Sequence, residues 1–267
     1  MYRGDQWSSA NFYERYNNLM KALITGASSG IGRDMARYLS KLGYDLIIVA
    51  RRTDLLEELK SELKTGVEIV CLDISKKENC YELFEKHKDI DVLVNNAGFG
   101  VFGHFHKTDL EKELNMIDTN IVAVHILTKL YLREMMKKDK GHILNVASIA
   151  GFMVGPLMAS YYASKNYIVA LSRAISKELK KEKSKVKVSV LCPGPVRTNF
   201  DDVAGVRFRP KSLSSEYVAK YGIDKMLEGK EVIIPGKLMK SAKVANKLSP
   251  SPLAIEIAYH SQKSKEK

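Results

Sequence analysis

The sequence lacks the features that would place it in a membrane or outside the cell. It contains no run of roughly eighteen apolar residues, the length that a membrane-spanning helix needs. It shows no charged segment followed by an apolar one, so we expect no secretory signal. Cysteine is scarce, and Cys71, Cys80 and Cys192 show no C-x-x-C spacing. We therefore expect reduced thiols in a cytoplasmic protein, with Cys71 and Cys192 in the core because each ends an apolar run.

Repeats of fixed period and low-complexity linkers are also missing from the sequence. The chain has 267 residues, of which 45% are hydrophobic and 28% charged, as in an ordinary globular protein. Short apolar runs alternate with helical patterns along most of its length. Such alternation predicts βαβ units, and therefore one α/β domain with a parallel sheet that helices cover on both faces.

The expected elements can be given by their residue ranges. The strands are expected at 22–25, 46–50, 67–72, 91–95, 142–147, 186–191 and 232–234. The helices are expected at 30–42, 54–64, 76–87, within 108–138, and at 160–182 and 215–228. Together these ranges place a single domain at residues 20–236.

The two ends of the chain differ from this pattern. Residues 1–19 lack clear periodicity and precede Met20, so we treat them as an N-terminal extension, either native or upstream of a natural start. Residues 237–267 form a basic tail in which apolar and lysine side chains follow opposite helical faces until Pro250-Ser251-Pro252 interrupts the pattern. Such a tail can cap its own domain or a neighbouring subunit, or lie on a membrane surface; we favour the first interpretation.

The chain carries a formal net charge of +12, from 43 basic and 31 acidic residues. This charge could attract nucleic acid or an anionic membrane, or it could be a solvated surface that also attracts an anionic cofactor. The lysines cluster at 137–140, 177–187 and 237–267, mostly where helices are expected to end, which favours the second interpretation. No zinc spacing or aromatic RNA-binding motif accompanies the charge, so we expect no nucleic-acid partner.

A tyrosine and a lysine four residues apart, Tyr161 and Lys165, are candidates for proton transfer. Positions i and i+4 share a face of a helix, and Ser148 lies upstream. At roughly 4 Å and an effective dielectric of ~20, an ammonium favours a phenolate by about 4 kcal/mol. The spacing therefore predicts a tyrosine pKa lowered toward neutrality, before any cost of burying the lysine.

Glycines at 26, 30 and 32 follow the first expected strand and precede a helix. Such a turn permits close approach of the backbone to a phosphate, which the N-terminus of the next helix also favours. The second strand ends in Ala50-Arg51-Arg52, without a carboxylate to bind a ribose 2′-hydroxyl. Arg51 could bind a 2′-phosphate, so this position predicts NADP(H). Asp73, after the third strand, is a candidate contact for the adenine amino group.

These motifs together resemble the short-chain dehydrogenase/reductase family in its common branch, over residues 20–236. The motifs occur in order as Thr25–Gly32, Asn95-Asn96-Ala97-Gly98, Asn120, Ser148, Tyr161 with Lys165, and Pro193–Thr198. The resemblance implies a Rossmann-type doubly wound parallel sheet of about seven strands in the order 3-2-1-4-5-6-7. A finer resemblance is to reductases whose second strand ends in Ala-Arg-Arg and which prefer NADP(H).

The resemblance assigns the catalytic roles to Asn120, Ser148, Tyr161 and Lys165. Tyr161 would be the general acid or base in the interconversion of a carbonyl and a secondary alcohol, and Ser148 would stabilise the substrate oxygen. Lys165 would lower the Tyr161 pKa and hold the nicotinamide ribose, and Asn120 would help to hold a water that relays protons. A mid-helix asparagine bonded to a backbone carbonyl is the structural alternative for Asn120.

The resemblance also implies a set of residues around the cofactor. The segment 95–98 would support the sheet and pack near the adenosine ribose, and 193–198 would cover the nicotinamide. The predicted cofactor-binding residues are Gly26, Ser28, Ser29, Gly30, Ile31, Gly32, Arg51, Arg52, Asp73, Ile74, Asn95, Ala97, Gly98, Tyr161, Lys165, Pro193, Gly194, Val196 and Thr198. We expect no metal site, because His104 and His106 have no further ligand nearby in the sequence.

The sequence predicts only the chemical class of the substrate. Phe200, Val203, Val206 and Phe208 suggest an apolar wall with a basic rim, which predicts a medium or long apolar carbonyl compound. The family implies a homodimer or homotetramer. The alternative function is a dinucleotide-binding regulatory protein of the same fold without turnover, which the intact catalytic set argues against.

Overall fold

The structure is a computed structural model that describes residues 20–197, 212–236, 238–241 and 249–264. Its centre is a seven-stranded sheet, and all the strand pairs in it are parallel. From one edge to the other the strands are β3 (Val67–Cys71), β2 (Asp45–Ala50), β1 (Lys21–Thr25), β4 (Val92–Asn95), β5 (His142–Val146), β6 (Lys187–Leu191) and β9 (Val232–Ile233). The predicted fold class and strand order are therefore confirmed.

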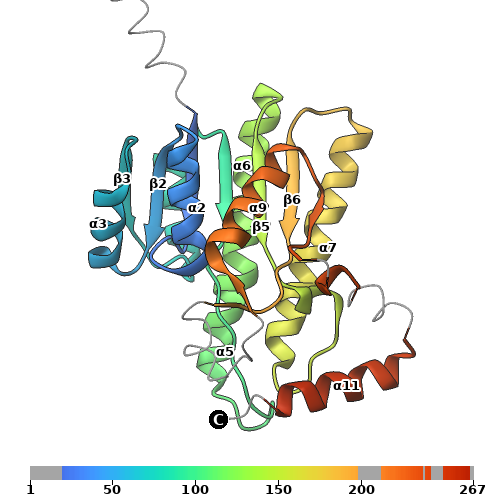
Figure 1. Ribbon diagram of the computed structural model, residues 1–267. Coiled ribbons are helices and arrows are strands. Elements are labelled where there is room, and N and C mark those ends of the chain that lie inside the picture. The colour runs from blue at the N-terminus through green and yellow to red at the C-terminus, as the bar shows by residue number, and fades with distance from the viewer. Residues whose placement is uncertain (1–19, 198–211, 237, 242–248, 265–267) are drawn as a thin grey trace, which may run out of the picture.

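Helices cover both faces of this sheet (Figure 1). One face carries α2 (Gly30–Lys41), α3 (Thr53–Glu62) and α9 (Ser215–Leu227). The opposite face carries α4 (Lys77–Lys86), α6 (Val124–Lys138) and α7 (Ala159–Lys181). Successive residues of a strand point to opposite faces, so Ala22 and Ile24 join the first core layer while Leu23 joins the second. This explains why both faces of each strand are apolar in the sequence.

The long helix expected within 108–138 is divided into three segments. It consists of α5 (Leu110–Ile117), the π-helical segment η1 (Asp118–Ala123) and α6. A 3₁₀ segment, η2 (Ile149–Phe152), precedes α7, and the two-residue strands β7 (Val196–Arg197) and β8 (Leu213–Ser214) pair in parallel outside the main sheet. Apolar periodicity does not distinguish α-helix from a single π turn, so this break was not predictable from the pattern.

The C-terminal helix α11 (Ser251–Lys263) was not predicted. The Pro250-Ser251-Pro252 run marks the beginning of this helix, with a proline in its first turn. A proline is compatible with that position because the first N–H groups of a helix have no partner within it. Most of the amphipathic pattern predicted for 238–248 lies outside the described residues, as does the extension 1–19.

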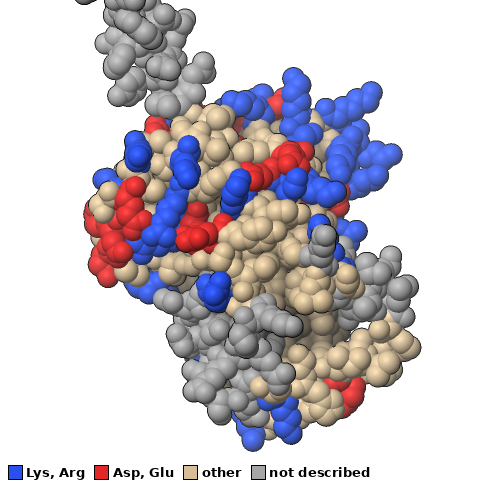
Figure 2. Space-filling view, in the orientation of Figure 1, with Lys and Arg blue, Asp and Glu red and all other residues tan. Residues whose placement is uncertain are grey.

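The placement of the cysteines and lysines is also informative. Cys192 and Cys80 are buried, but Cys71 is exposed, so the prediction that it belongs to the core is wrong. The last residue of an edge strand such as β3 has no second strand to cover it. Figure 2 shows basic side chains gathered at the end of the molecule where α6 and α7 end, and both helices carry lysines in their last turns. These lysines complement the negative ends of the helix dipoles. None of the helices in the described ranges is both long enough and apolar enough to cross a membrane.

A polar network crosses the centre of the core between β4, β5, α6 and α7. Asn95 Nδ2 donates to Asn145 Oδ1 (2.8 Å) and to Thr128 Oγ1 (3.1 Å), and Asn145 Nδ2 donates to Ser172 Oγ (3.0 Å). Thr128 and Asn145 are almost fully buried. Buried polar groups that bond to one another fix the register of the elements that carry them, because any slip leaves them unpaired.

Removal of two different hydroxyl groups on α6 is expected to change the stability of the protein by different amounts. Thr128→Val removes a hydroxyl that bonds to both asparagines of the network, and we expect it to lower the free energy of unfolding by about 1–3 kcal/mol. Tyr131→Phe removes a buried hydroxyl that has no hydrogen-bond partner among the described residues, and we expect no loss of stability. Urea titration of both variants and the wild type measures the difference. Equal destabilisation by the two variants would contradict this interpretation.

Candidate active site

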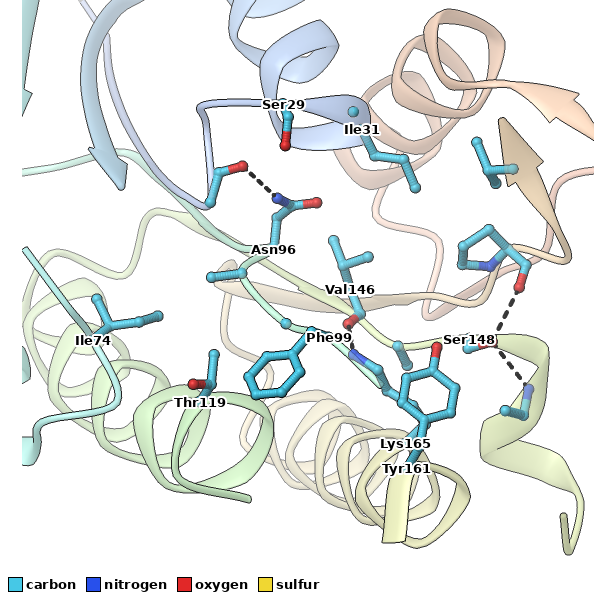
Figure 3. Close-up of a pocket in the computed structure, with 18 of the residues that line it drawn as sticks. Ser29, Ile31, Ile74, Asn96, Phe99, Thr119, Val146, Ser148, Tyr161 and Lys165 are labelled. Carbon is cyan, nitrogen blue, oxygen red and sulfur yellow. Dashed lines mark hydrogen bonds between the residues drawn. The ribbon is translucent and has the colours of Figure 1, made fainter. Parts of the chain in front are cut away.

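A cavity of about 690 Å³ opens at the carboxyl ends of the strands of the sheet (Figure 3). In a doubly wound sheet this is the edge at which ligands bind. The turn after β1, the ends of β2 to β5, the beginning of α7, the segment 193–196 and Gln262 of α11 all contribute to its lining. Segments far apart in the sequence are therefore brought to one site.

Two positions in and after the turn that follows β1 have no room for a side chain larger than that of glycine. Gly26 has a positive φ of 67°, and a Cβ placed on it would lie 2.7 Å from Ala97 Cα. A Cβ on Gly32 would lie 2.3 Å from Asn96 Nδ2. The helix α2 that follows has no acidic residue in its first turn and no side chain capping its N-terminus. Its unpaired N–H groups are thus suited to an anion such as a dinucleotide pyrophosphate.

Asn96 fastens this turn to the end of β4. Its side-chain Nδ2 donates to the carbonyl oxygens of Thr25 (3.0 Å) and Gly26 (3.1 Å), and its backbone N–H donates to Thr25 Oγ1 (3.0 Å). Asn96 and Ala97 line the cavity, whereas Asn95 points into the core network described above. The support of the sheet that was predicted for this segment thus comes from Asn95, and its contribution to the cavity begins at Asn96.

Two arginines and an aspartate lie at the ends of β2 and β3. Arg52 Nη2 donates to Ser28 Oγ (3.1 Å) and Ser29 Oγ (3.2 Å), so it reaches the glycine turn. Arg51 is exposed, and its Nη1 lies 3.9 Å from Asp73 Oδ2. The parallel pairing of β2 with β3 brings this carboxylate beside the arginines, although it is distant from them in the sequence. The region therefore holds two positive charges and one negative charge.

Tyr161 and Ser148 lie side by side on the lining of the cavity (Figure 3). Tyr161 lies in the first turn of α7, and Ser148 precedes η2, where its Oγ accepts from Ala150 N–H (3.2 Å). Burial raises the pKa of the Tyr161 phenol above its ordinary value, and its hydrogen bond with Ser148 works weakly in the opposite direction. The phenol is therefore neutral near pH 7 in this structure, and it holds a proton beside a hydroxyl group.

Lys165 is buried one helical turn after Tyr161. Its Nζ donates to the carbonyl oxygen of Val146 (3.2 Å) and lies 5.7 Å from the centroid of the Tyr161 ring. Burial lowers the Lys165 pKa to about 8. The predicted lowering of the Tyr161 pKa by Lys165 is not found here, because desolvation dominates the pKa of both side chains. Lys165 does reach the cavity, as predicted.

Asn120 lies in η1, beneath the cavity lining. Its Oδ1 accepts from the Phe99 N–H (3.1 Å), and its Nδ2 donates to the Phe99 carbonyl (2.9 Å) and to Ser164 Oγ (3.1 Å). A Cβ on Gly98 would lie 2.7 Å from Asn120 Oδ1 and 3.3 Å from Lys165 Nζ. Asn120 thus joins the segment after β4 to α7 close to Lys165. π-helical turns such as η1 are frequent at functional sites.

A buried carboxylate fixes the beginning of α7. Glu113 of α5 accepts hydrogen bonds from the hydroxyl groups of Thr108 and Ser160. Ser160 directly precedes Tyr161 in the sequence. The position of the Tyr161 side chain is therefore coupled to α5 through one hydrogen bond.

Most of the predicted site residues meet in this one cavity. The predicted residues that line it are Gly26, Ser28, Ser29, Gly30, Ile31, Arg51, Arg52, Asp73, Ile74, Ala97, Gly98, Ser148, Tyr161, Lys165, Pro193, Gly194 and Val196. Gly32, Asn95 and Asn120 lie behind the lining and support it. Thr198 lies outside the described residues, as do the apolar side chains predicted between 200 and 208.

The sequence did not reveal several lining residues on the opposite side of the cavity from the glycine turn. They are Phe99, Lys112, Asn115, Thr119, Met158, Tyr162 and Gln262. Tyr162 is three residues from Lys165, so the four-residue spacing that points to Tyr161 does not point to it. Gln262 carries no sequence signal, because its contact with α7 joins positions 100 residues apart.

The described part of the chain shows no cluster of three or more His, Cys, Asp or Glu side chains that could bind a metal. His104 and His106 lie in an exposed loop with ring centroids 5.8 Å apart.

Comparison with known sequences identifies related oxidoreductases. A sequence model described as short chain dehydrogenase matches residues 20–205. The 3-oxoacyl-(acyl-carrier-protein) reductase of Rickettsia prowazekii is 32% identical over 205 residues, which are 76% of this chain and 83% of that protein. The residues matched by the sequence model, 20–205, include the turn after β1, Ser148 and the Tyr161–Lys165 pair.

Comparison with solved structures gives the same fold. A short-chain dehydrogenase from Sphingobium yanoikuyae in complex with NADPH is 26% identical with a TM-score of 0.76, covering 86% of this chain and 94% of that chain. One from Burkholderia phymatum in complex with NAD is 24% identical with a TM-score of 0.77, covering 86% and 93%. These two neighbours hold different dinucleotides.

The burial of Lys165 predicts a pH-dependent effect on stability. Its pKa of about 8 in the folded protein is below the ordinary 10.5, so the cost of burying the ammonium is fully present below pH 8 and is relieved as the pH rises toward 10.5. At pH 7, we expect Lys165→Met to raise the free energy of unfolding by about 3 kcal/mol. Denaturant titration without dinucleotide between pH 7 and 10 measures this gap, which should close with rising pH. Lys129→Met, at an exposed site on α6, is the control, and a gap independent of pH would contradict the assignment.

Proposed function

The chain belongs to the short-chain dehydrogenase/reductase family, and from this premise we propose that it interconverts a carbonyl compound and a secondary alcohol with NADP(H). The observation that carries the proposal is the position of Tyr161 and Ser148 in one cavity with a glycine turn that fits a dinucleotide. A nicotinamide, when bound, supplies or accepts the hydride in this chemistry. The remaining tasks belong to the residues of the chain itself.

The lining residues suit a dinucleotide along the whole length of the cavity. The N-terminus of α2 would bind the pyrophosphate, Asp73 and Ile74 the adenine, and Ala97 and Gly98 the adenosine ribose. Lys165 would hold the nicotinamide ribose, and the segment 193–196 would cover the nicotinamide. In the NADP(H) form, Arg51 and Arg52 would bind the 2′-phosphate, with Asp73 beside them.

Proton transfer in this proposal takes place at the Tyr161 hydroxyl. The neutral phenol donates its proton to the substrate oxygen as that oxygen gains negative charge, and it takes the proton back in the reverse direction. Ser148 holds the same oxygen through its hydroxyl group, which stabilises the charge before the proton arrives. Lys165 stabilises the phenolate left behind, and Asn120 supports Lys165 through Gly98 and Phe99. A water held near Asn120 would then restore the proton.

A dinucleotide-binding protein without turnover is the weaker alternative. At one end of the cavity a phenol and a second hydroxyl, those of Tyr161 and Ser148, lie side by side, an arrangement that proton transfer needs and that dinucleotide binding alone does not explain. The cytoplasm remains the proposed compartment, and a homodimer or homotetramer remains the proposed assembly. The proposed substrate is an apolar carbonyl compound, in line with the apolar residues predicted between 200 and 208.

Removal of the Tyr161 hydroxyl provides the central test. We expect Tyr161→Phe to lower ketone-dependent oxidation of NADPH by at least about a hundredfold, because Tyr161 carries the phenol that lies beside Ser148 among the described lining residues. Absorbance at the NADPH band over a panel of ketones, aldehydes and 3-oxoacyl thioesters measures the rate, with NADPH affinity followed by fluorescence. Tyr167→Phe, on the same helix but bonded to His125 outside the cavity, is the matched control. Full activity in Tyr161→Phe would refute the proposed mechanism.

The arginines provide a separate test of cofactor preference. Arg51→Ala is expected to raise KM for NADPH roughly 10- to 100-fold and to leave KM for NADH nearly unchanged, since only NADPH carries the 2′-phosphate. The double variant with Arg52→Ala should prefer NADH. Initial rates with both dinucleotides give the ratio of the two KM values, and Lys60→Ala on α3 controls for loss of surface charge. Equal losses with both dinucleotides would argue against 2′-phosphate recognition.

A further inference from the structure

The C-terminal helix α11 contributes to the cavity through one buried side chain. Gln262 lies in its last turn, is 3% exposed and lines the cavity together with Tyr161 and Tyr162. Ala258, one turn earlier, is also buried, whereas Leu253 and Ile257 point to solvent. The inner face of α11 therefore packs against the domain, and it presents an amide to the cavity at the end away from the glycine turn.

Gln262 contacts the tyrosine that follows Tyr161 in the sequence. Gln262 Nε2 donates a hydrogen bond to the Tyr162 hydroxyl oxygen. The Tyr162 ring lies against the segment before α7, where a Cβ placed on Gly155 would be 2.4 Å from its carbon atoms. The rings of Tyr161 and Tyr162 meet edge to face with centroids 6.1 Å apart. The second phenol is thus held rigidly beside the first.

Apolar side chains pack against the two tyrosine rings. Met158 is buried, and Phe102 packs against it together with both tyrosine rings. Burial raises the pKa of Tyr162, so its hydroxyl keeps its hydrogen at neutral pH. Among the described residues there is no acceptor for that hydrogen, so it can be donated to a bound molecule. A few fixed polar groups in an otherwise apolar cavity are the usual basis of ligand discrimination.

We propose that Tyr162 and Gln262 recognise a second oxygen-bearing group of the substrate, a hydroxyl or carbonyl separate from the one that reacts at Tyr161. The inference rests on the proposed function and narrows its substrate class to carbonyl compounds with two oxygen functions. The Tyr162 hydroxyl donates to the second oxygen, and Gln262 holds the phenol in the orientation that makes this possible. The helix α11 is consequently part of the substrate compartment.

A purely structural role for the pair makes a different prediction. If the hydrogen bond only attached α11 to α7, its loss would weaken the binding of all substrates to the same extent. A site that hydrogen-bonds a particular group instead penalises the analogue that lacks it, because its own polar atoms are then left unpaired. The ratio between matched substrates therefore separates recognition from attachment.

The test compares matched pairs of ketones, identical except that one member carries a second hydroxyl or carbonyl group two to six bonds away. For at least one pair, we expect the wild type to prefer the oxygenated member by about tenfold or more in kcat/KM. Tyr162→Phe and Gln262→Leu should reduce this ratio toward one, and the affinity for NADPH should stay within about twofold. The control Tyr167→Phe should keep the wild-type ratio.

A binding measurement keeps this test separate from that of the proposed function. Isothermal titration calorimetry of the corresponding alcohols, with NADP⁺ present, needs no turnover. Preferential binding of the oxygenated member that is lost in both variants supports the inference, even if no ketone is reduced and the proposed function fails. A wild type that binds both members equally or binds neither overturns the inference. So does an unchanged preference in both variants.

Discussion

The close approach of two turns, one after β1 and the other after β4, is the constraint on which the rest of the site depends. Gly26 and Ala97 are so near that no side chain fits between them, and Asn96 bonds the two turns together. The same short segment continues through Gly98 to Phe99, whose backbone is bonded by Asn120. Four consecutive residues thus join the glycine turn to the part of the cavity that holds Tyr161 and Lys165, so neither part can shift without the other.

Burial, more than attraction between charges, sets the pKa values of Tyr161 and Lys165. The four-residue spacing predicts an attraction of about 4 kcal/mol between an ammonium and a phenolate at close range. In the folded protein, however, Lys165 lies 5.7 Å from the Tyr161 ring centroid and points to a carbonyl oxygen, and both side chains are desolvated. Without a ligand, the site therefore holds the neutral Tyr161 phenol beside Lys165, whose pKa is below that of an ordinary lysine. A bound dinucleotide would alter this balance by bringing its own charges and hydroxyl groups.

The fold was predictable because its signals are local. Apolar runs of strand length and the glycines after β1 depend on nearby residues, and the strand order follows from the family resemblance. The position of Asp73 beside Arg51 depends instead on strand pairing, and the contact of Gln262 with Tyr162 depends on packing between distant segments. The helix α11 was missed for a different reason, because a proline was interpreted as a break where it marks a first turn. Sequence patterns thus predict the glycine turn and the strand ends that line the cavity better than the side lined by Tyr162 and Gln262, which packing brings together from distant segments.

The exposed thiol at the end of β3 has a practical consequence. Cys71 Sγ lies 3.4 Å from the Arg51 carbonyl oxygen, while the other two cysteines of the chain are buried. A maleimide dye would consequently attach at one position, beside Arg51. The native chain thereby carries an attachment point for a fluorescent reporter at the carboxyl ends of β2 and β3, without any engineered cysteine.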